Sequence, residues 1–223
     1  MQVIYLPFVN INMSFEENVI ELPFLTPEEC KDIEAWAFDF EQELIAKGYG
    51  DNKPAPEYFD NVTTSNYQNY NFFHYFPELA DRLADCLFNI NKDLEWPIIC
   101  QAWVNIYRKG QGINWHNHQG RMGKSFSCNI FVSGDTEPGV TYKPFNSKGI
   151  VRENKIGHIH IFPCELFHYV PPIETDTPRI TLGLTVHSSS DINTNLLNQI
   201  AFNSQMNQDT IILTKEHYEQ SSS

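Results

Sequence analysis

The chain has 223 residues, enough for one full-sized domain. Hydrophobic residues make up 41% and charged residues 19%, which predicts a folded protein with a large core rather than a disordered chain. The formal net charge is −13. We therefore expect no binding to nucleic acid or anionic lipid, since both attract basic proteins.

The ends and the cysteines of the chain indicate where the protein resides. No apolar run in the sequence reaches the roughly 20 residues of a membrane-spanning helix. Residues 1–11 lack the basic flank and the cleavage pattern of a signal peptide. The five cysteines are widely spaced and form no C-x-x-C pair, so we expect reduced core residues. These features predict a cytoplasmic protein with no membrane partner.

The first part of the chain predicts edge strands and then a helix. Short apolar stretches within residues 2–25 are typical of strands at a sheet edge. Thr26 and Glu29 have the spacing of a capping box, and Pro27 suits the first helical position. Apolar residues then recur every three or four positions, and Gly48 is a plausible stop.

A long loop and a second helix follow. Residues 50–71 are rich in Asn, Asp, Pro and Tyr without a steady period, which predicts a surface loop. From Pro77, leucines at spacing four predict a packing helix that ends before Pro97. Both helices are expected to support the domain through core packing.

The remainder of the chain up to residue 187 is rich in short β segments separated by turn residues. No helical crossover lies between them, which favours an antiparallel sandwich or barrel behind an N-terminal helical layer. After His187 the chain is polar except for residues 211–213, and we expect a peripheral segment. The expected strands are residues 99–107, 124–132, 140–144, 155–162 and 179–187.

Five of the eight histidines lie between residues 116 and 168, within the β-rich region. On an extended strand, His116 and His118 would present two imidazoles to one ion. His168 follows 52 residues later and is the candidate third ligand. Three imidazoles on one side of Fe, Zn or Cu would leave positions open for substrate and oxygen.

A candidate anion site follows the third histidine. Arg179 and Thr181 would share a face of an extended strand, where a guanidinium and a hydroxyl could jointly hold a carboxylate. The alternative is an arginine paired with a surface Asp or Glu.

The ordered set His116-x-His118, His168 and Arg179-x-Thr181 resembles the iron and 2-oxoglutarate dioxygenases, whose pattern is H-x-D/E, a distal His and R-x-S/T. It is most similar to the prolyl-4-hydroxylase-like branch, which carries a Y-x-x-G-Q lead-in before its first ligand. Tyr107, Gly110 and Gln111 stand at those offsets, and the phrase at residues 24–30 resembles the entry into that branch's first helix.

The resemblance implies a double-stranded β-helix, a jelly roll with iron in its mouth. It implies His116, His118 and His168 as Fe(II) ligands, and Arg179, Thr181 and Tyr107 as contacts of the cosubstrate 2-oxoglutarate. The reaction implied is hydroxylation by molecular oxygen with release of succinate and CO2. The primary substrate is a protein side chain or a small molecule that no motif identifies.

The chain departs from the family at one ligand, because His118 stands where a carboxylate belongs. His118 ligates the metal, or swings away and leaves an open position, or the protein is not an oxygenase. We favour ligation, since a neutral imidazole is a good iron ligand. A similar H-x-H pattern also occurs in a branch of 2-oxoglutarate oxygenases.

These observations predict one dioxygenase domain over residues 1–190, with strands and supporting helices in 1–97, the jelly-roll core in 98–187, and a peripheral segment in 191–223. Three alternatives remain: a three-histidine zinc hydrolase or hydratase, a cupin-type dioxygenase, and a non-catalytic jelly-roll binding protein. His158 and His160 form a second same-face pair, which we interpret as structural or as supporting the ligands.

Overall fold

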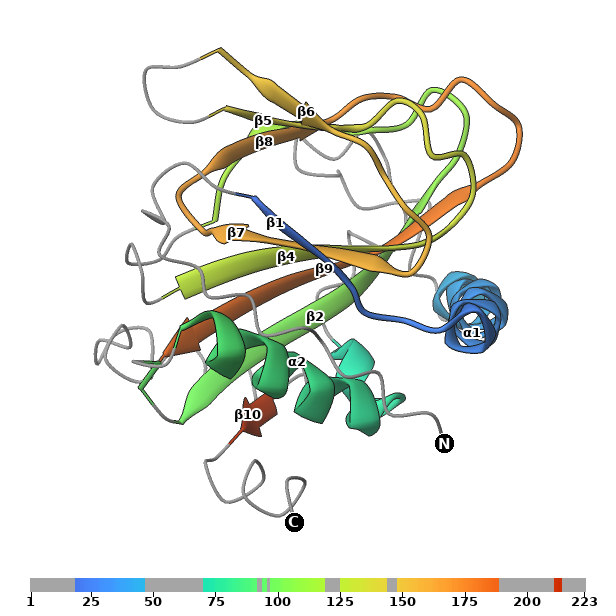
Figure 1. Cartoon of the computed structure of the whole chain (residues 1–223). Helices are drawn as coiled ribbons and strands as arrows, with labels where there is room; N and C mark the ends of the chain where they lie inside the picture. The colour runs from blue at the N-terminus through green and yellow to red at the C-terminus, as the bar shows by residue number, and fades with distance from the viewer. Residues whose placement is uncertain are drawn as a thin grey trace.

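The computed structural model describes residues 19–46, 70–91, 94–95, 97–118, 125–143, 148–188 and 211–213. Two antiparallel sheets dominate this part of the chain (Figure 1). The larger sheet has six strands in the order β1-β7-β4-β9-β2-β10. Its strands are β1 (Ile20–Pro23), β7 (His158–Pro163), β4 (Ser125–Ser133), β9 (Arg179–Ser188), β2 (Ile98–Tyr107) and β10 (Ile211–Leu213).

The smaller sheet has four strands in the order β3-β8-β5-β6. The chain passes repeatedly from one sheet to the other, as in a jelly roll, and every described pairing is antiparallel. The expected double-stranded β-helix with supporting helices is therefore confirmed. The strands of this sheet are β3 (Ile113–His116), β8 (Phe167–Val170), β5 (Val140–Lys143) and β6 (Ile150–Arg152).

The five expected strands correspond to β2, β4, β5, β7 and β9, with ends that differ by no more than about three residues. The strands β3, β6 and β8 are additional to the five expected ones. Each of these strands has only three or four residues, too few for a period-two pattern to stand out.

Helix α1 (Pro27–Ala46) begins as the sequence predicts. The backbone N–H of Glu29 donates to Thr26 Oγ1 at 3.2 Å, and the N–H of Thr26 donates to Glu29 Oε2 at 2.8 Å. This reciprocal pair is a capping box, which satisfies two backbone donors at the start of the helix. Arg82 of the next α-helix binds the same carboxylate at 2.7 Å and so ties the two helices together.

Helix α2 (Pro77–Ile90) follows a single 3₁₀ turn, η2 (Phe72–His74), and buries one apolar face. A large core joins both helices to the six-stranded sheet. The five cysteines are free and buried, as expected. The members of the core on α2 are Leu79, Ala80, Leu83, Ala84, Cys86 and Leu87.

The two faces of the large sheet differ in chemistry. On β2, the residues at even positions are apolar and join the core under the helices. The residues at odd positions alternate to the opposite face, toward the small sheet, and they include Gln101, Trp103, Asn105 and Tyr107. The side of the sheet that faces into the roll is therefore rich in polar groups.

Several sequence predictions lie outside the described residues. They are the strands expected within residues 2–18, the helix stop at Gly48, the loop at 50–69, and the tail apart from β10. Ile211–Leu213 pairs with Ile98–Cys100 at the edge of the large sheet. None of the described helices is long and apolar enough to cross a bilayer.

Candidate metal centre

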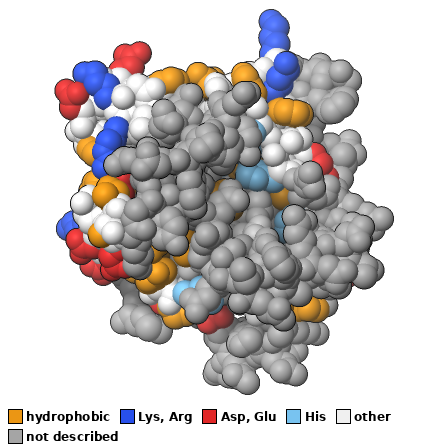
Figure 2. Space-filling view, turned by 180° about the vertical axis from the view of Figure 1, so that it is seen from behind, with side chains coloured by type: hydrophobic (Ala, Val, Ile, Leu, Met, Phe, Trp, Pro, Cys, Tyr) orange, Lys and Arg blue, Asp and Glu red, His pale blue; other side chains and the backbone are white. Residues whose placement is uncertain are grey.

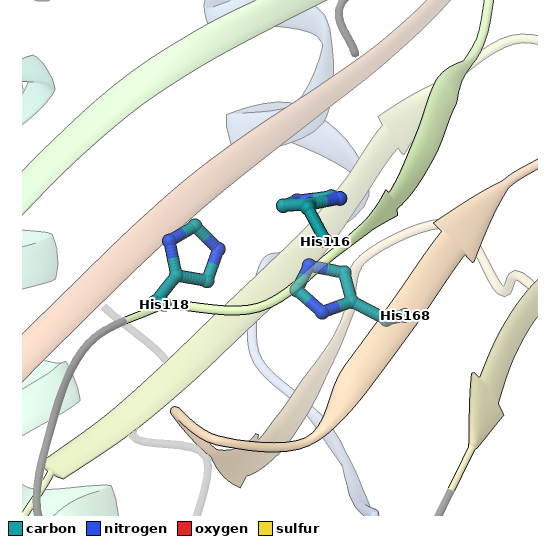
Figure 3. A group of neighbouring side chains, drawn as sticks. All are labelled: His116, His118 and His168. Carbon is teal, nitrogen blue, oxygen red and sulfur yellow. The ribbon is translucent and has the colours of Figure 1, made fainter.

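Three imidazoles from two distant stretches of the chain meet inside the roll (Figure 3). His116 ends β3 and lies opposite His168 of β8 in the strand register. His118 follows β3, and its backbone N–H donates to the carbonyl of Cys164 at 2.8 Å. One ligand atom from each residue lies within 4.8 Å of the others, so a single ion could contact all three.

Hydrogen bonds orient two of these rings. Nδ1 of His116 lies 2.8 Å from the carbonyl of Asn114, and Nδ1 of His168 lies 3.1 Å from the carbonyl of Leu166. A carbonyl oxygen only accepts, so each Nδ1 carries the proton and each Nε2 carries the lone pair. This second contact fixes the ring and its tautomer as it does in metal-ligating histidines.

The surroundings keep the three imidazoles neutral. Burial, together with the neighbouring His116 and His187, lowers the pKa of His118 to about 3. Burial also lowers the pKa of His168 well below its usual value, and it lowers the pKa of His116. A metal ion needs the neutral imidazole, so the site meets this requirement at neutral pH without releasing protons.

His118 lies with the other two imidazoles rather than apart from them. Its ring centroid is 5.3 Å from that of His116 and 5.3 Å from that of His168. The ring of Trp103 lies 5.9 Å away on the other side, from strand β2. The described part of the chain gives the His118 ring no hydrogen-bond partner.

The imidazoles border a cavity of about 370 Å³ between the sheets. Histidine side chains are visible in the recessed part of the face shown in Figure 2. The inner residues of β2 run along one wall, and Gly183 and Thr185 of β9 lie beside them. The described residues that line this cavity include no Asp, Glu, Lys or Arg.

Arg179 is buried, with 1% of its surface exposed. Its Nε donates to the carbonyl of Asp135 at 2.9 Å, and its Nη2 donates to the carbonyl of Glu137 at 2.5 Å. Nη1 is buried and has no hydrogen-bond partner among the described residues. No described acidic side chain forms an ion pair with this guanidinium, so the surface-pair alternative does not apply.

Tyr107 links Arg179 to the cavity. It pairs with Arg179 across β2 and β9, lines the cavity, and forms a side-chain hydrogen bond with Thr181. Burial raises the pKa of its hydroxyl, which therefore stays protonated. Asn105 Nδ2 also donates to Thr181 Oγ1, at 3.3 Å. The three residues predicted to contact a cosubstrate thus lie together, although Arg179 and Thr181 do not themselves line the cavity.

The second histidine pair lies on β7, beside the edge strand β1 of the large sheet. His158 Nδ1 is 3.0 Å from a carboxylate oxygen of Glu21, and His160 Nδ1 is 3.0 Å from the hydroxyl of Tyr142. The Tyr142 ring stacks near the His168 ring at 6.2 Å. Neither His158 nor His160 joins a metal-ligand group among the described residues.

The polar wall of the cavity was not predicted from the sequence. Gln101, Trp103 and Asn105 occupy alternate positions before Tyr107 and share its face. Alternation from Tyr107 could have identified them, because side chains two apart on a strand point the same way. The contact of Trp103 with Gly183 on β9 gives no signal in the sequence, since it depends on strand register.

Comparisons with known proteins agree with this architecture. Neither the protein-family models nor the curated proteins match the sequence. Solved structures that share the fold include a monooxygenase, a carbocyclase and a hydroxylase, at identities that establish the fold alone. They are the non-heme monooxygenase ThoJ with nickel (11% identity, 93% of this chain and 97% of that one, TM-score 0.57), the α-ketoglutarate-dependent carbocyclase SnoK from nogalamycin biosynthesis (12%, 78% and 81%, 0.56), and a Pseudomonas putida prolyl-4-hydroxylase (15%, 76% and 92%, 0.50).

The molecule is therefore an all-antiparallel double-stranded β-helix with helical support, the fold of 2-oxoglutarate and iron oxygenases. The sequence motifs resemble the same family. A prolyl-4-hydroxylase, the branch with the most similar motifs, is among the structures that share the fold.

Proposed function

We propose that the protein is an Fe(II)- and 2-oxoglutarate-dependent dioxygenase that hydroxylates an uncharacterised substrate and releases succinate and CO2. The fold and the three converging imidazoles support a metal-dependent reaction. Bound iron would supply the activation of oxygen and the oxidative decarboxylation of the keto acid. The protein side chains would bind, orient and desolvate the reactants.

The observation that supports 2-oxoglutarate binding is the buried Nη1 of Arg179, which has no hydrogen-bond partner among the described residues. Two of its nitrogens are held by backbone carbonyls, so the guanidinium is fixed with one donor group left over. A buried donor without a partner costs about 1–3 kcal/mol, and more when the group is charged. A carboxylate would satisfy both this donor and the buried positive charge.

Each candidate residue has a distinct task in this proposal. His116 and His168 would hold iron through Nε2, His118 would hold it through one of its ring nitrogens, and other coordination positions would stay open. Arg179 would bind the far carboxylate of 2-oxoglutarate. The Tyr107 hydroxyl, held by Thr181, would line the path between the metal and the guanidinium.

A zinc hydrolase is the main rival, since three histidines and a water also activate hydroxide. Such a site has no use for a buried guanidinium beside the cavity. A non-catalytic roll is the second alternative. In such a protein, three neutral imidazoles at ligand distance would have no function.

The direct test is succinate formation by purified protein with Fe(II), 2-oxoglutarate and oxygen. We expect slow turnover even without a primary substrate. The Arg179→Met variant keeps much of the side-chain volume but removes the donors, so we expect a roughly 10- to 100-fold higher Kd for 2-oxoglutarate with Mn(II) binding retained. Lys155→Met is the matched control, because it removes an exposed positive charge that does not line the cavity.

Two results would contradict the proposal. One is the absence of 2-oxoglutarate binding to the metal-loaded wild-type protein. The other is an Arg179→Met variant that binds the keto acid as tightly as the Lys155→Met control does.

A further inference from the structure

The cavity extends well beyond the space that 2-oxoglutarate needs. Its wall on β2 runs from Tyr107 to Gln101, six residues at about 3.3 Å each, or roughly 20 Å. Tyr107 marks the end next to Arg179. Trp103 lies level with the imidazoles, 5.9 Å from the His118 ring. The part of the cavity past Trp103, toward Gln101, is therefore left for another molecule.

The far end carries amide and hydroxyl groups. Thr185 Oγ1 donates to Gln101 Oε1 at 3.4 Å. This bond uses the amide oxygen of Gln101 and leaves its two Nε2 donors available to a ligand. Asn129 of β4 lies opposite Gly183 and also lines the cavity. The described residues offer neither Gln101 Nε2 nor the Asn129 amide a hydrogen-bond partner.

The flat ring of Trp103 lies beside these amides and next to the His118 imidazole. A Cβ atom added to Gly183 would meet the Trp103 ring at 2.6 Å, so the indole lies flat across the glycine. One face of the Trp103 ring covers β9, and Trp103 and Gly183 both line the cavity. A ligand group bound beside Trp103 would contact the indole ring and the neighbouring amides of Gln101 and Asn129.

The described residues that line this end carry no charged side chain. Arg108, just after β2, is paired with Glu41. Among the described residues visible in Figure 2, the Lys and Arg side chains lie toward the edges of the face and away from the recess. A ligand charge placed beyond Trp103 would lose its hydration without gaining an opposite charge, which is costly.

We propose that the segment of the cavity bounded by Gln101, Trp103, Asn129 and Thr185 binds the primary substrate, and that the substrate presents an uncharged, hydrogen-bonding group there, a carboxamide or a group of similar polarity. The identification of this ligand as a substrate rests on the proposed function. The amide donors of Gln101 and Asn129 select an acceptor group, and the absence of formal charge among the described lining residues disfavours carboxylates and ammonium groups.

The test uses three probes of one size: propionamide, propionate and propylammonium. Their binding to the Ni(II)-loaded protein with 2-oxoglutarate is measured by ligand-observed NMR, which requires no turnover. We expect saturable binding of propionamide at least about tenfold tighter than that of either charged probe. Absence of propionamide binding, or equal or tighter binding of a charged probe, would overturn the proposal.

Two variants sharpen the result. Gln101→Glu keeps the shape of the side chain but replaces a donor with a negative charge, so propylammonium should now bind more tightly than propionamide. Asn129→Asp should cause the same reversal and serves if Gln101→Glu does not fold, as judged by circular dichroism. Asn89→Asp on the exposed face of α2 makes the same change of charge outside the cavity and should leave the order of the probes unchanged.

An unchanged order in both cavity variants would show that the probes bind elsewhere and would refute the assignment. The affinity for 2-oxoglutarate is measured on the same Ni(II)-loaded samples. Its absence would contradict the proposed function, whereas the order of the three probes tests the neutral subsite by itself.

Discussion

His118 determines how much charge the candidate metal centre carries. With an imidazole in place of a carboxylate, the three side chains contribute no negative charge, and the buried setting keeps them neutral. The rings of His116 and His168 are fixed by carbonyls, whereas that of His118 is placed by its backbone and by Trp103. The third ligand is thus the least constrained of the set.

Replacing His118 tests whether it binds the metal. We expect His118→Ala to weaken Mn(II) binding more than about tenfold, since even residues that only orient a ligand are worth 10- to 100-fold. His118→Asp should restore the affinity, because a carboxylate is also a good ligand for this class of metal. The measurement is a calorimetric titration under nitrogen.

The exposed His74 supplies the control for this series. His74→Ala removes an imidazole from η2 and should leave the Mn(II) affinity unchanged. An Ala variant at position 118 with wild-type affinity would mean that His118 swings away from the metal.

Single residues also show what the sequence could and could not predict. The three histidines were predicted to converge, because the ordered motif implies a fold that brings them together, and they do. The partners of Arg179 could not be predicted, because they are backbone carbonyls of the loop after β4. Carbonyl groups are present at every position, so no sequence pattern marks the ones that are used.

Among the elements, α1 is attached to the roll by a buried carboxylate. Glu41 is 1% exposed, and Arg108, just after β2, donates to both of its oxygens at 2.8 and 2.6 Å. Arg108 itself remains partly exposed, with 45% of its side chain accessible. The two partners therefore depend on the pair to different degrees.

This difference predicts an asymmetric effect on stability. Arg108→Met leaves a buried carboxylate without its partner and should lower the free energy of unfolding by about 3 kcal/mol or more. Glu41→Gln leaves a partly exposed cation that water can solvate, so we expect a loss of only about 1 kcal/mol. Urea unfolding at neutral pH measures both. A larger loss in Glu41→Gln than in Arg108→Met would show that the carboxylate does not depend on this arginine.

His160 of β7 makes the edge of the large sheet sensitive to acid. Burial lowers its pKa to about 4 in the folded protein. The unfolded chain, with a pKa near 6.5, binds a proton first as the pH falls. The stability that neutral His160 contributes is therefore complete above about pH 6.5 and is lost progressively toward pH 4. The neighbouring groups that face it are Glu21, Tyr142, Arg152, Lys155 and His158.

Replacing His160 should reduce this loss. We expect the wild-type protein to lose roughly 3 kcal/mol more than His160→Gln between pH 7 and pH 4. Chemical unfolding at a series of pH values gives the comparison, with the exposed His74→Gln as control. Parallel pH profiles for wild type and His160→Gln would rule out His160 as the source.

At the scale of the whole molecule, the jelly roll was predictable and its closing strands were not. The long strands β2, β4 and β9 carry clear alternation and turn boundaries, which predicted antiparallel sheets. The small sheet contributes His116 and His168, yet its strands are too short to be recognised locally. They form because the register places them opposite each other in the roll.

The extent of the domain stays a prediction. Residues 1–190 were expected to form the oxygenase unit and 191–223 a peripheral segment. Ile211–Leu213 adds an edge strand to the large sheet beside β2. β1, from the N-terminal part, pairs with β7 and packs near His158 and His160. Segments on both sides of the predicted core thus contribute strands to the large sheet.

The account requires one ion and one keto acid to occupy the roll together. A crystal structure of the protein with Mn(II) and 2-oxoglutarate, grown without oxygen, tests this most directly. We predict an anomalous peak bound by His116, His118 and His168, and a carboxylate of the keto acid within hydrogen-bond distance of Arg179 Nη1. A metal bound elsewhere, or a keto acid that leaves Arg179 Nη1 without a partner, would contradict the account.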